Sequence, residues 1–484
     1  MARTGNINAL VKMAYELKEH QERVSSRAAS GDNLLVYHSL GSGKSLTSLD
    51  AAIRKIKAGQ DKVRFVVPAP LRQNMRKEME KHDIPEEIRK KILIESYEKV
   101  AKNPEAYADG GIDFLVMDEA HRIRNEGTAR SAAIKKLVGA SKQRMLLTGS
   151  PIYNQRTDIA SLINATAGQK VMPDNADEFD KRYIQYVEKN PGLLMRMMGV
   201  KPGVTMELKN KKELQSIGHK YIDKYDAKKE NPEDFPTATE KTVEVPMGDK
   251  QYDTYRYLEG DIPFHIRLKI SHNLPLNKKE SKDLNAFVTG VRQASNTNAA
   301  YLKDGSDPEG TKITKIVSDV AERHGDGATG HKGVVYSTYL DSGLKQLSQQ
   351  LTQRGIKHEM FNGSLNDKQR REMVLRYNNG ETPWLLVSSS GTEGLDLKGT
   401  RSMHIMEPHF NEQKIKQVIG RGDRYHSHHH LPVQDRNVET LRYISTRPKL
   451  FGKLDRGTSI DQYLMQMSKD KESLHERILR TMTS

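Results

Sequence analysis

The chain has 484 residues, which is too long for one ordinary hydrophobic core, so we expect two domains of ordinary size with additional elements. Hydrophobic residues make up 36% and charged residues 29%, and no segment approaches the roughly 18 consecutive apolar residues of a membrane span. The absence of cysteine excludes disulfide frameworks, thiolate zinc sites and cysteine nucleophiles. The net charge of +15 favours a polyanionic partner such as nucleic acid, although a generally basic protein would show the same surplus.

The N-terminal segment, MARTGNINALVKMAYELKEH, has apolar residues at helical spacing and no uninterrupted apolar stretch of the secretory kind. We therefore expect a protein that does not associate with membranes. Its expected compartment is the cytoplasm, or the nucleus if the host is a eukaryote.

Short apolar segments alternate with helical patterns in the first third of the chain. The segment 33–37 runs directly into a glycine-rich loop, and a helical pattern follows at 45–57. Further strands are expected at 63–67, 91–94, 114–117 and 144–147. Strands that alternate with helices indicate βαβ units and a parallel sheet covered on both faces.

A second alternating region starts near residue 333. Its expected strands are 333–336, 384–387 and 403–406. Between the two regions the periodicity weakens, with one plausible strand at 242–246, and residues 249–305 are mostly helical in pattern. The expected organisation is a first lobe at 1–245, a helical linker at 246–310, and a second lobe with a C-terminal helix at 311–484.

The glycine-rich loop has the sequence that a phosphate-binding loop requires. Gly41, Ser42 and Gly43 would turn backbone N–H groups towards a phosphate, and Lys44 would place a mobile positive charge on the β- and γ-oxygens. The hydroxyl of Ser45 can ligate Mg²⁺. The usual first glycine of the pattern is replaced by histidine, and a glycine-rich turn without special purpose is the alternative.

Acidic residues follow the apolar segment 114–117. Asp118 would hold Mg²⁺ directly or through water, and Glu119 would orient or deprotonate the water that attacks the γ-phosphate. His121 can hydrogen-bond to neighbouring groups and report the presence of phosphate. On their own these residues could form an ordinary polar strand end. The phosphate-binding loop earlier in the chain favours the catalytic interpretation.

Hydroxyl residues follow the expected strand 144–147. Thr148 and Ser150 could couple the carboxylates to the neighbouring domain. The alternative is an ordinary turn, in which the same residues are common.

A basic pair lies far downstream, in the sequence QVIGRGDRYH. Gln417, Arg421 and Arg424 are expected on one helix, where the two arginines, three residues apart, would share a face. A guanidinium placed against the γ-phosphate stabilises the charge that spreads over its oxygens during transfer. The alternative is a solvated basic helix.

Together and in this order, these segments resemble superfamily 2 helicases and translocases, and among them the Swi/Snf-type translocases of double-stranded DNA. The segment Leu17–Val24 is similar to the family motif whose glutamine, here Gln21, reads adenine. Val66–Leu71 resembles the motif that touches a nucleic-acid backbone, here with Pro68 and Ala69. The resemblance implies an α/β fold of two RecA-like lobes, each a parallel sheet covered by helices, with helical insertions near the hinge.

Other segments carry the same resemblance. Asp118–Asn125 and Leu147–Asn154 are close to the Swi/Snf form, and Ser388–Asp396 falls where the family has its fifth motif. The resemblance places Thr392 and Glu393 near DNA. It also places Asp396 near the ribose or the cleft between the lobes, with Gln417 among the ATP-binding residues.

The residues after Arg424 differ from those that commonly follow this arginine in chromatin remodellers of the Swi/Snf type. Tyr425–Pro432 is more similar to compact translocases of large DNA viruses and phages, which would add the virion to the expected compartments. The residues His426, His428, His429 and His430 suggest a metal site. Without cysteine or an obvious carboxylate partner, a polar loop is the preferred interpretation.

The expected function is that of an ATP- and Mg²⁺-dependent motor that moves along DNA, with duplex DNA as the expected track. We expect the protein to be a monomer. The sequence does not identify a protein that would recruit it. One alternative is a strand-separating helicase acting on DNA or RNA. No separating wedge is visible in the sequence, although a hairpin could lie within 165–245. A second alternative is a nucleic-acid-binding scaffold that uses ATP as a switch without turnover.

Overall fold

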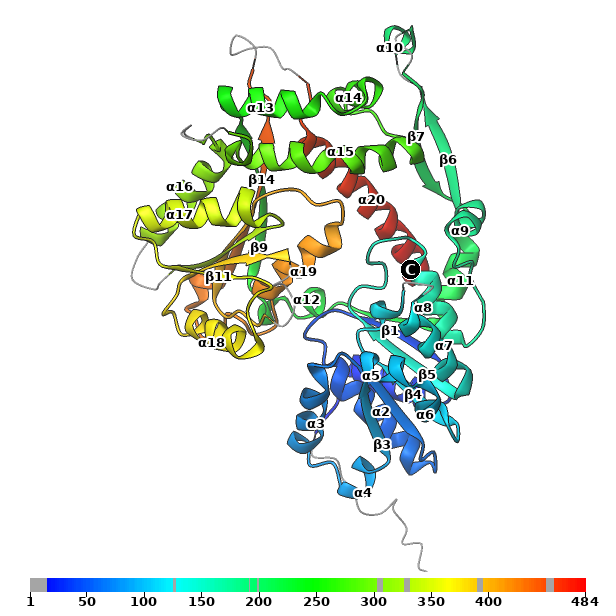
Figure 1. The fold of residues 1–484 in the computed structure, drawn as a ribbon. Helices are drawn as coiled ribbons and strands as arrows, with labels where there is room; N and C mark the ends of the chain where they lie inside the picture. The colour runs from blue at the N-terminus through cyan, green and yellow to red at the C-terminus, as the bar shows by residue number, and fades with distance from the viewer. Residues whose placement is uncertain are drawn as a thin grey trace, which may run out of the picture. The chain divides into compact units, whose positions relative to one another are not determined.

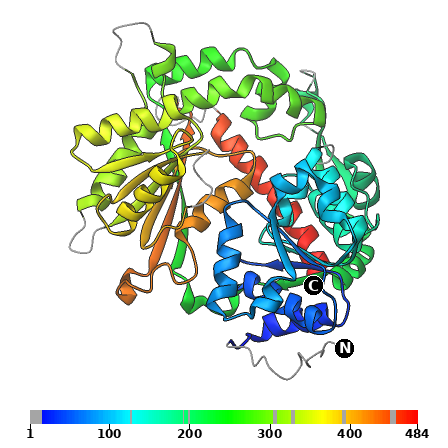
Figure 2. The same ribbon diagram turned by 60° about the horizontal axis from the view of Figure 1, so that its bottom comes forward.

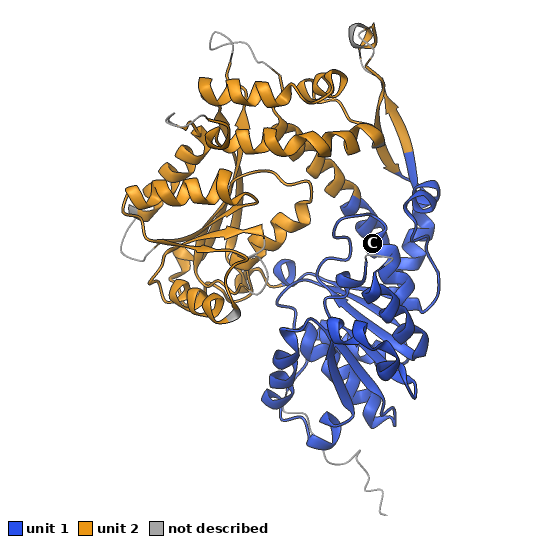
Figure 3. Cartoon of the chain, viewed as in Figure 1, with its two compact units in different colours: residues 1–185, 208–230, 475–484 blue, residues 186–207, 231–474 orange. Residues whose placement is uncertain are grey.

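The computed structural model describes residues 15–124, 128–190, 192–197, 200–302, 308–325, 331–389, 395–449 and 457–484. The chain forms two compact units (Figure 3). The first contains residues 1–185, 208–230 and 475–484, and the second contains 186–207 and 231–474. Within the described residues, no helix combines the length and the apolar content that crossing a membrane requires.

The first unit is built on a six-stranded sheet with the order β3-β2-β4-β5-β1-β8, and every neighbouring pair is parallel. The strands are β1 (Leu34–His38), β2 (Val63–Val67), β3 (Ile92–Ser96), β4 (Ile112–Met117), β5 (Ser141–Thr148) and β8 (Ile222–Tyr225). Their near-continuous apolar sequences fit burial on both faces of a parallel sheet.

Helices cover both faces of this sheet (Figure 1). The helices of the first unit are α1 (Glu19–Ala29), α2 (Lys44–Lys57), α3 (Leu71–Lys81), α4 (Glu86–Arg89), α5 (Tyr97–Lys102), α6 (Pro104–Ala108), α7 (Ala129–Ala140), α8 (Asp158–Ala167), α9 (Ala176–Tyr183), α11 (Lys211–Tyr221) and α12 (Ala227–Glu230). The helices α1, α2, α3 and α4 share one hydrophobic core with the sheet. The helices α7 and α8 also contact strands of this sheet.

The second unit has its own six-stranded parallel sheet, ordered β11-β12-β10-β13-β14-β9. Its strands are β9 (Thr237–Pro246), β10 (Lys332–Ser337), β11 (His358–Phe361), β12 (Trp384–Ser388), β13 (Thr400–Ile405) and β14 (Asn437–Thr446). The expectation of two parallel sheets covered by helices is confirmed.

Two apolar clusters place the helices of this unit on opposite faces of the sheet (Figure 2). The helices α16 (Thr311–Gly325) and α17 (Lys345–Gln353) pack on one face, and α18 (Asp367–Asn378) and α19 (Glu412–Gly422) pack on the other. A π-helical turn, Leu340–Leu344, precedes α17.

A helical layer forms a further core of the second unit. It contains α13 (Asp249–Glu259), α14 (Phe264–Ser271), α15 (Lys278–Asn296) and the first turns of the C-terminal helix α20 (Ile460–Thr483). Short 3-10 turns occur at Ala120–Ile123, Pro232–Asp234, Ala299–Tyr301 and Val433–Asp435.

The expected boundary at residue 245 falls inside β9. This strand is assigned to the second unit because it pairs with β14 along its whole length, from Thr237 with Asn437 to Pro246 with Thr446. The partner strand lies about two hundred residues further along the chain, so no local pattern indicates the pairing.

The end of the C-terminal helix is packed closely against α11 in the first unit. Gly218 lies in α11, and a methyl group at this position would collide with the backbone of Met482. Backbone atoms cannot move aside as the tip of a flexible side chain can, so glycine is required here for packing.

We therefore predict that Gly218→Ala lowers the free energy of unfolding by about 1–3 kcal/mol. Chemical denaturation followed by circular dichroism measures this effect. The matched control is Gly139→Ala in α7, where a methyl group meets nothing within 4 Å, and we expect that change to be neutral or stabilising by up to about 1 kcal/mol. Equal stabilities of the two variants would contradict the packing argument.

Candidate nucleotide site of the first unit

The parallel sheet brings three expected site segments to one edge. The strands β4, β5 and β1 are consecutive in the sheet order. The phosphate loop follows β1, Asp118 and Glu119 follow β4, and Thr148 ends β5. Since the carboxyl ends of parallel strands meet at one edge, these segments are neighbours although far apart in sequence.

The phosphate loop has the geometry needed for an anion site. Gly41 and Gly43 have φ values of +82° and +77°, which L-amino acids with side chains rarely adopt, and α2 begins directly afterwards at Lys44. The Lys44 ammonium donates to the carbonyl oxygens of His38 at 2.8 Å and Ser39 at 2.9 Å. The lysine is thus held across the loop. Ser45 lies in the first turn of α2, half-buried.

Gln21 packs directly on the phosphate loop. Its side-chain amide donates to the carbonyls of Ser42 at 3.4 Å and Gly43 at 3.3 Å, and its amide oxygen accepts from the Lys18 backbone N–H at 2.9 Å. A methyl group at Gly43 would collide with this amide. Gly43 is therefore needed both for its backbone conformation and for the approach of Gln21.

Burial sets the charges of the site. Burial lowers the pKa of Lys44, and the carboxylates of Glu119 and then Asp118 oppose that shift. Burial, followed by repulsion from Glu119, raises the pKa of Asp118 to about 6. The Glu119 backbone N–H donates to Asp118 Oδ1 at 2.8 Å, and Glu119 itself has a φ of +49°. For a residue with a side chain, such a backbone costs of the order of 1–3 kcal/mol and is typical of functional sites.

His121 joins the segments that follow β4 and β5. Its Nδ1 lies 3.3 Å from Glu119 Oε2 and 3.5 Å from Thr148 Oγ1. The Ser150 backbone N–H donates to Thr148 Oγ1 at 3.1 Å. The imidazole also stacks on Tyr153, with ring centroids 5.7 Å apart. The residues expected to couple the carboxylates to other parts of the protein thus form one connected chain.

Pro68 and Ala69 follow β2, the strand that neighbours β4 in the sheet. Pro68 is buried and Ala69 is exposed, and the Pro68 carbonyl accepts from the Leu71 N–H at 2.9 Å. The structure thus places them at the same edge of the sheet as Asp118.

The second unit contains the expected arginines, but one of them is not on the expected helix. Arg421 lies in the last turn of α19, which ends at Gly422, so the prediction that Arg424 shares its helical face is wrong. Asp423 has φ −101° and ψ 76°, which stops the helix before Arg424. The Arg424 guanidinium donates to the Gly420 carbonyl and to Asp396 Oδ1, each at 3.1 Å.

Three further predicted residues belong to the second unit. Gln417 lies on α19, and the carboxylate of Asp396 is exposed and paired with Arg424. Thr392 and Glu393, expected near nucleic acid, lie outside the described residues.

The structure adds four residues to the surroundings of the phosphate loop. His20 Nε2 lies 2.8 Å from the Ser42 carbonyl oxygen, and its ring stacks on Tyr225 with centroids 3.6 Å apart. The His38 side chain is buried, with Nε2 2.8 Å from Asp223 Oδ1. These contacts depend on the pairing of β8 with β1, for which the sequence has no short-range signal.

Comparison with known protein families decides the family. The SNF2-related domain matches residues 28–300, and the helicase conserved C-terminal domain matches residues 311–426. The chain belongs to the SNF2-related helicase family. The expected resemblance is thereby confirmed, and the protein is a nucleic-acid-dependent ATPase of superfamily 2 that binds nucleotide. The alternative of a scaffold without turnover is set aside.

Several relatives of this SNF2-related protein are viral. A protein of Acanthamoeba polyphaga mimivirus, named as an ATP-dependent RNA helicase, is 30% identical over 95% of this chain and 94% of its own length. A homologue of termination factor NPH-I from African swine fever virus is 22% identical over 91% of this chain and 74% of its own length. The helicase domain of Pyrococcus furiosus Hef has a similar fold, with a TM-score of 0.50 at 15% identity over 88% of this chain and 95% of that one.

The raised pKa of Asp118 predicts a dependence of stability on pH. The folded state binds the Asp118 proton more tightly than the unfolded chain does, so this carboxyl lowers stability as pH rises from about 4 to about 6. At pH 7 we expect Asp118→Asn to raise the free energy of unfolding by about 1–3 kcal/mol while abolishing ATP hydrolysis. Denaturant unfolding at about pH 4.5 and about pH 7, near the two ends of this range, measures the difference.

The pH dependence provides the control for this prediction. The stabilising effect of Asp118→Asn should shrink at the acidic end of the window, where the native carboxyl is itself protonated. An Asn variant that is less stable than the unchanged protein at pH 7 would contradict the electrostatic account.

Proposed function

We infer that this SNF2-related protein is an ATP- and Mg²⁺-dependent motor that moves along duplex DNA without separating its strands. The observation that carries the proposal is the cluster of Lys44, Asp118 and Glu119 at one sheet edge in a chain that matches the SNF2-related domain over residues 28–300. The net charge of +15 supports a polyanionic track.

The proposed roles in the first unit follow from the contacts. Gln21 binds the adenine while its amide remains tied to the phosphate loop. The loop N–H groups and Lys44 bind the phosphates, and Glu119 takes the proton of the attacking water. His121 contacts both Glu119 and Thr148, so a change in the position of the imidazole would alter the orientation of the proposed catalytic carboxylate.

Ser45 and Asp118 are the proposed Mg²⁺ ligands. A hydroxyl and a carboxylate oxygen are ligands that this hard cation prefers, and the pKa of the Asp118 carboxyl is raised by burial and by repulsion from Glu119. When bound, Mg²⁺ neutralises charge on the β- and γ-oxygens during transfer.

The second unit supplies the remaining proposed ATP contacts. We propose that Arg421 and Arg424 bind the γ-phosphate during hydrolysis, with Asp396 and Gln417 contributing to the nucleotide site. The γ-phosphate would then replace the Asp396 carboxylate as the partner of the Arg424 guanidinium. Thr392 and Glu393, with Pro68 and Ala69, are the proposed nucleic-acid contacts, so binding should have weak sequence preference and steep salt dependence.

The track can be tested by measuring phosphate release in parallel with duplex DNA, single-stranded DNA, RNA and no nucleic acid. We expect duplex DNA to stimulate the rate most strongly. Glu119→Gln should abolish the stimulated rate while retaining ATP binding, because only the proton acceptor is removed. Stronger stimulation by RNA or by single strands than by duplex DNA would contradict the proposed track.

One structural feature favours strand separation as a second candidate function. The strands β6 (Ile184–Lys189) and β7 (Gly203–Leu208) form a two-stranded ribbon, with the short helix α10 (Leu193–Met197) at its far end (Figure 1). The side chains of Leu193 and Met197 are 76% and 78% exposed. Exposed apolar groups at the tip of a projecting ribbon could wedge between bases.

A pair of assays distinguishes the two functions. A translocating motor should displace the third strand of a DNA triplex, whereas a helicase should also release a strand from a partial duplex. We expect triplex displacement without unwinding, and a Leu193→Ser/Met197→Ser variant with unchanged displacement and ATPase rates. Unwinding that is lost in this variant, with the ATPase rate retained, would instead support strand separation by the ribbon.

A further inference from the structure

The histidine-rich segment after Arg424 separates into three different environments. His428 is buried, with Nε2 2.8 Å from the Thr400 carbonyl oxygen and Nδ1 2.8 Å from Ser427 Oγ. His430 lines a cavity together with Lys332 and Arg401. His426 and His429 are exposed and lie beside each other, with ring centroids 3.9 Å apart.

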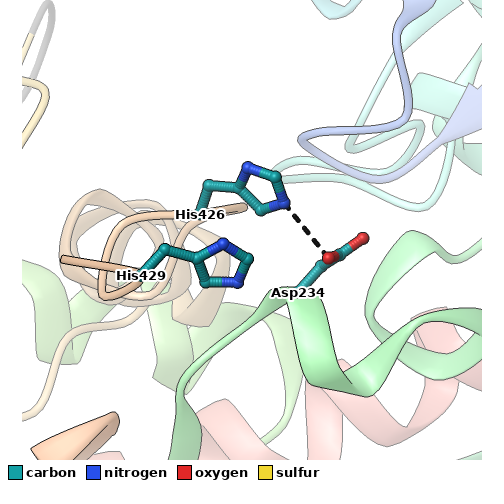
Figure 4. A group of neighbouring side chains, drawn as sticks. All are labelled: Asp234, His426 and His429. Carbon is teal, nitrogen blue, oxygen red and sulfur yellow. Dashed lines mark hydrogen bonds and ion pairs between the residues drawn. The ribbon is translucent and has the colours of Figure 1, made fainter. Parts of the chain in front are cut away.

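A carboxylate completes the exposed pair. Asp234, at the end of the 3-10 turn Pro232–Asp234, lies 3.1 Å from His426 Nε2, and its backbone carbonyl accepts from the His426 N–H at 2.8 Å (Figure 4). One ligand atom from each of Asp234, His426 and His429 lies within 4.8 Å of the other two. The sequence shows the histidines but not their acidic partner, which comes from almost two hundred residues earlier.

We propose that Asp234, His426 and His429 form a binding site for a divalent transition-metal ion of the Zn²⁺ type. Two imidazoles and one carboxylate form a donor set that suits Zn²⁺ and is poorly matched to Mg²⁺. Ligand atoms of a tetrahedral Zn²⁺ site are about 3.3 Å apart, given bonds of about 2.0 Å. The Asp234–His426 distance of 3.1 Å already fits, and a rotation of the exposed His429 side chain would close the remaining gap.

The surrounding contacts hold two of the ligands in place. The His426 ring stacks on Tyr425 with centroids 3.9 Å apart, and Tyr425 packs edge-on against Phe235 at 5.8 Å. His426 has a φ of +56°, a conformation that turns its side chain back towards Asp234. A rigid first pair of ligands reduces the entropy that metal binding must overcome.

The proposed ion would fasten two segments of the second unit to each other. Asn231 is the first residue of this unit after Glu230, so Asp234 lies where the chain enters it from the first unit. On the other side, Ser427 Oγ donates to the Arg424 carbonyl at 2.8 Å. Metal binding should therefore restrict the turn that begins at Arg424, independently of the role proposed for that arginine in hydrolysis.

The experiment is a calorimetric titration of the chelator-treated full chain with Zn²⁺, in the presence of excess Mg²⁺ to occupy the sites that prefer oxygen ligands. We expect one saturable ion per chain. Asp234→Asn and His429→Gln should each weaken binding by about tenfold or more, since each removes a ligand. The matched control, His430→Gln, changes the same residue type in the same segment and should retain the affinity. Unfolding curves of all variants establish that they remain folded.

Hydrogen exchange supplies a second measurement that does not depend on ATPase activity. Zn²⁺ should slow exchange of the amides of residues 424–431 in the unchanged protein and in His430→Gln, but not in Asp234→Asn. A protein without a saturable Zn²⁺ site, or an Asp234→Asn variant that binds as tightly as the control, would overturn the proposed site. Saturable binding with unchanged exchange would overturn its effect on the turn.

Discussion

Parallel pairing of β4, β5 and β1 is the constraint on which the proposed nucleotide site depends. All three strands end at the same edge of the sheet. The phosphate loop, the acidic pair and Thr148 are therefore neighbours in space although they are far apart in the sequence. The remaining parts of the site are attached to this edge. Gln21 and His20, which lie on α1, form hydrogen bonds with carbonyl oxygens of the phosphate loop. His121 contacts both Glu119 and Thr148.

The charges gathered at this edge are unfavourable for stability, as expected of the proposed catalytic site. Asp118 is buried beside Glu119, which raises its pKa, and Glu119 has a left-handed backbone that a residue with a side chain adopts at a cost. Lys44 is a compensating charge, but burial lowers its pKa. Such unfavourable arrangements persist where a ligand supplies the missing charge, which here would be the phosphates and Mg²⁺.

Most of the fold was predictable because its signals are local. Apolar segments ending in Gly41–Lys44 and in Asp118 indicate strands that lead into functional loops, and both lie where they were expected. Non-local pairings were not predictable: β9 joins the second sheet through β14, and Tyr225 reaches His20 through β8. The contact between Asp234 and His426 is also non-local, so the sequence did not predict it. At Arg424 the sequence pattern predicted a helix, but the backbone conformation of Asp423 ends the helix before that residue.

Lys44 and Glu119 are proposed to act as one hydrolytic unit at the shared sheet edge. Single-turnover ATP hydrolysis in Lys44→Ala, Glu119→Gln and the double variant tests it most directly. Residues that act as a unit are strongly non-additive, so the double variant should be about as slow as the slower single variant. Rate losses that multiply in the double variant would show independent contributions and contradict the account.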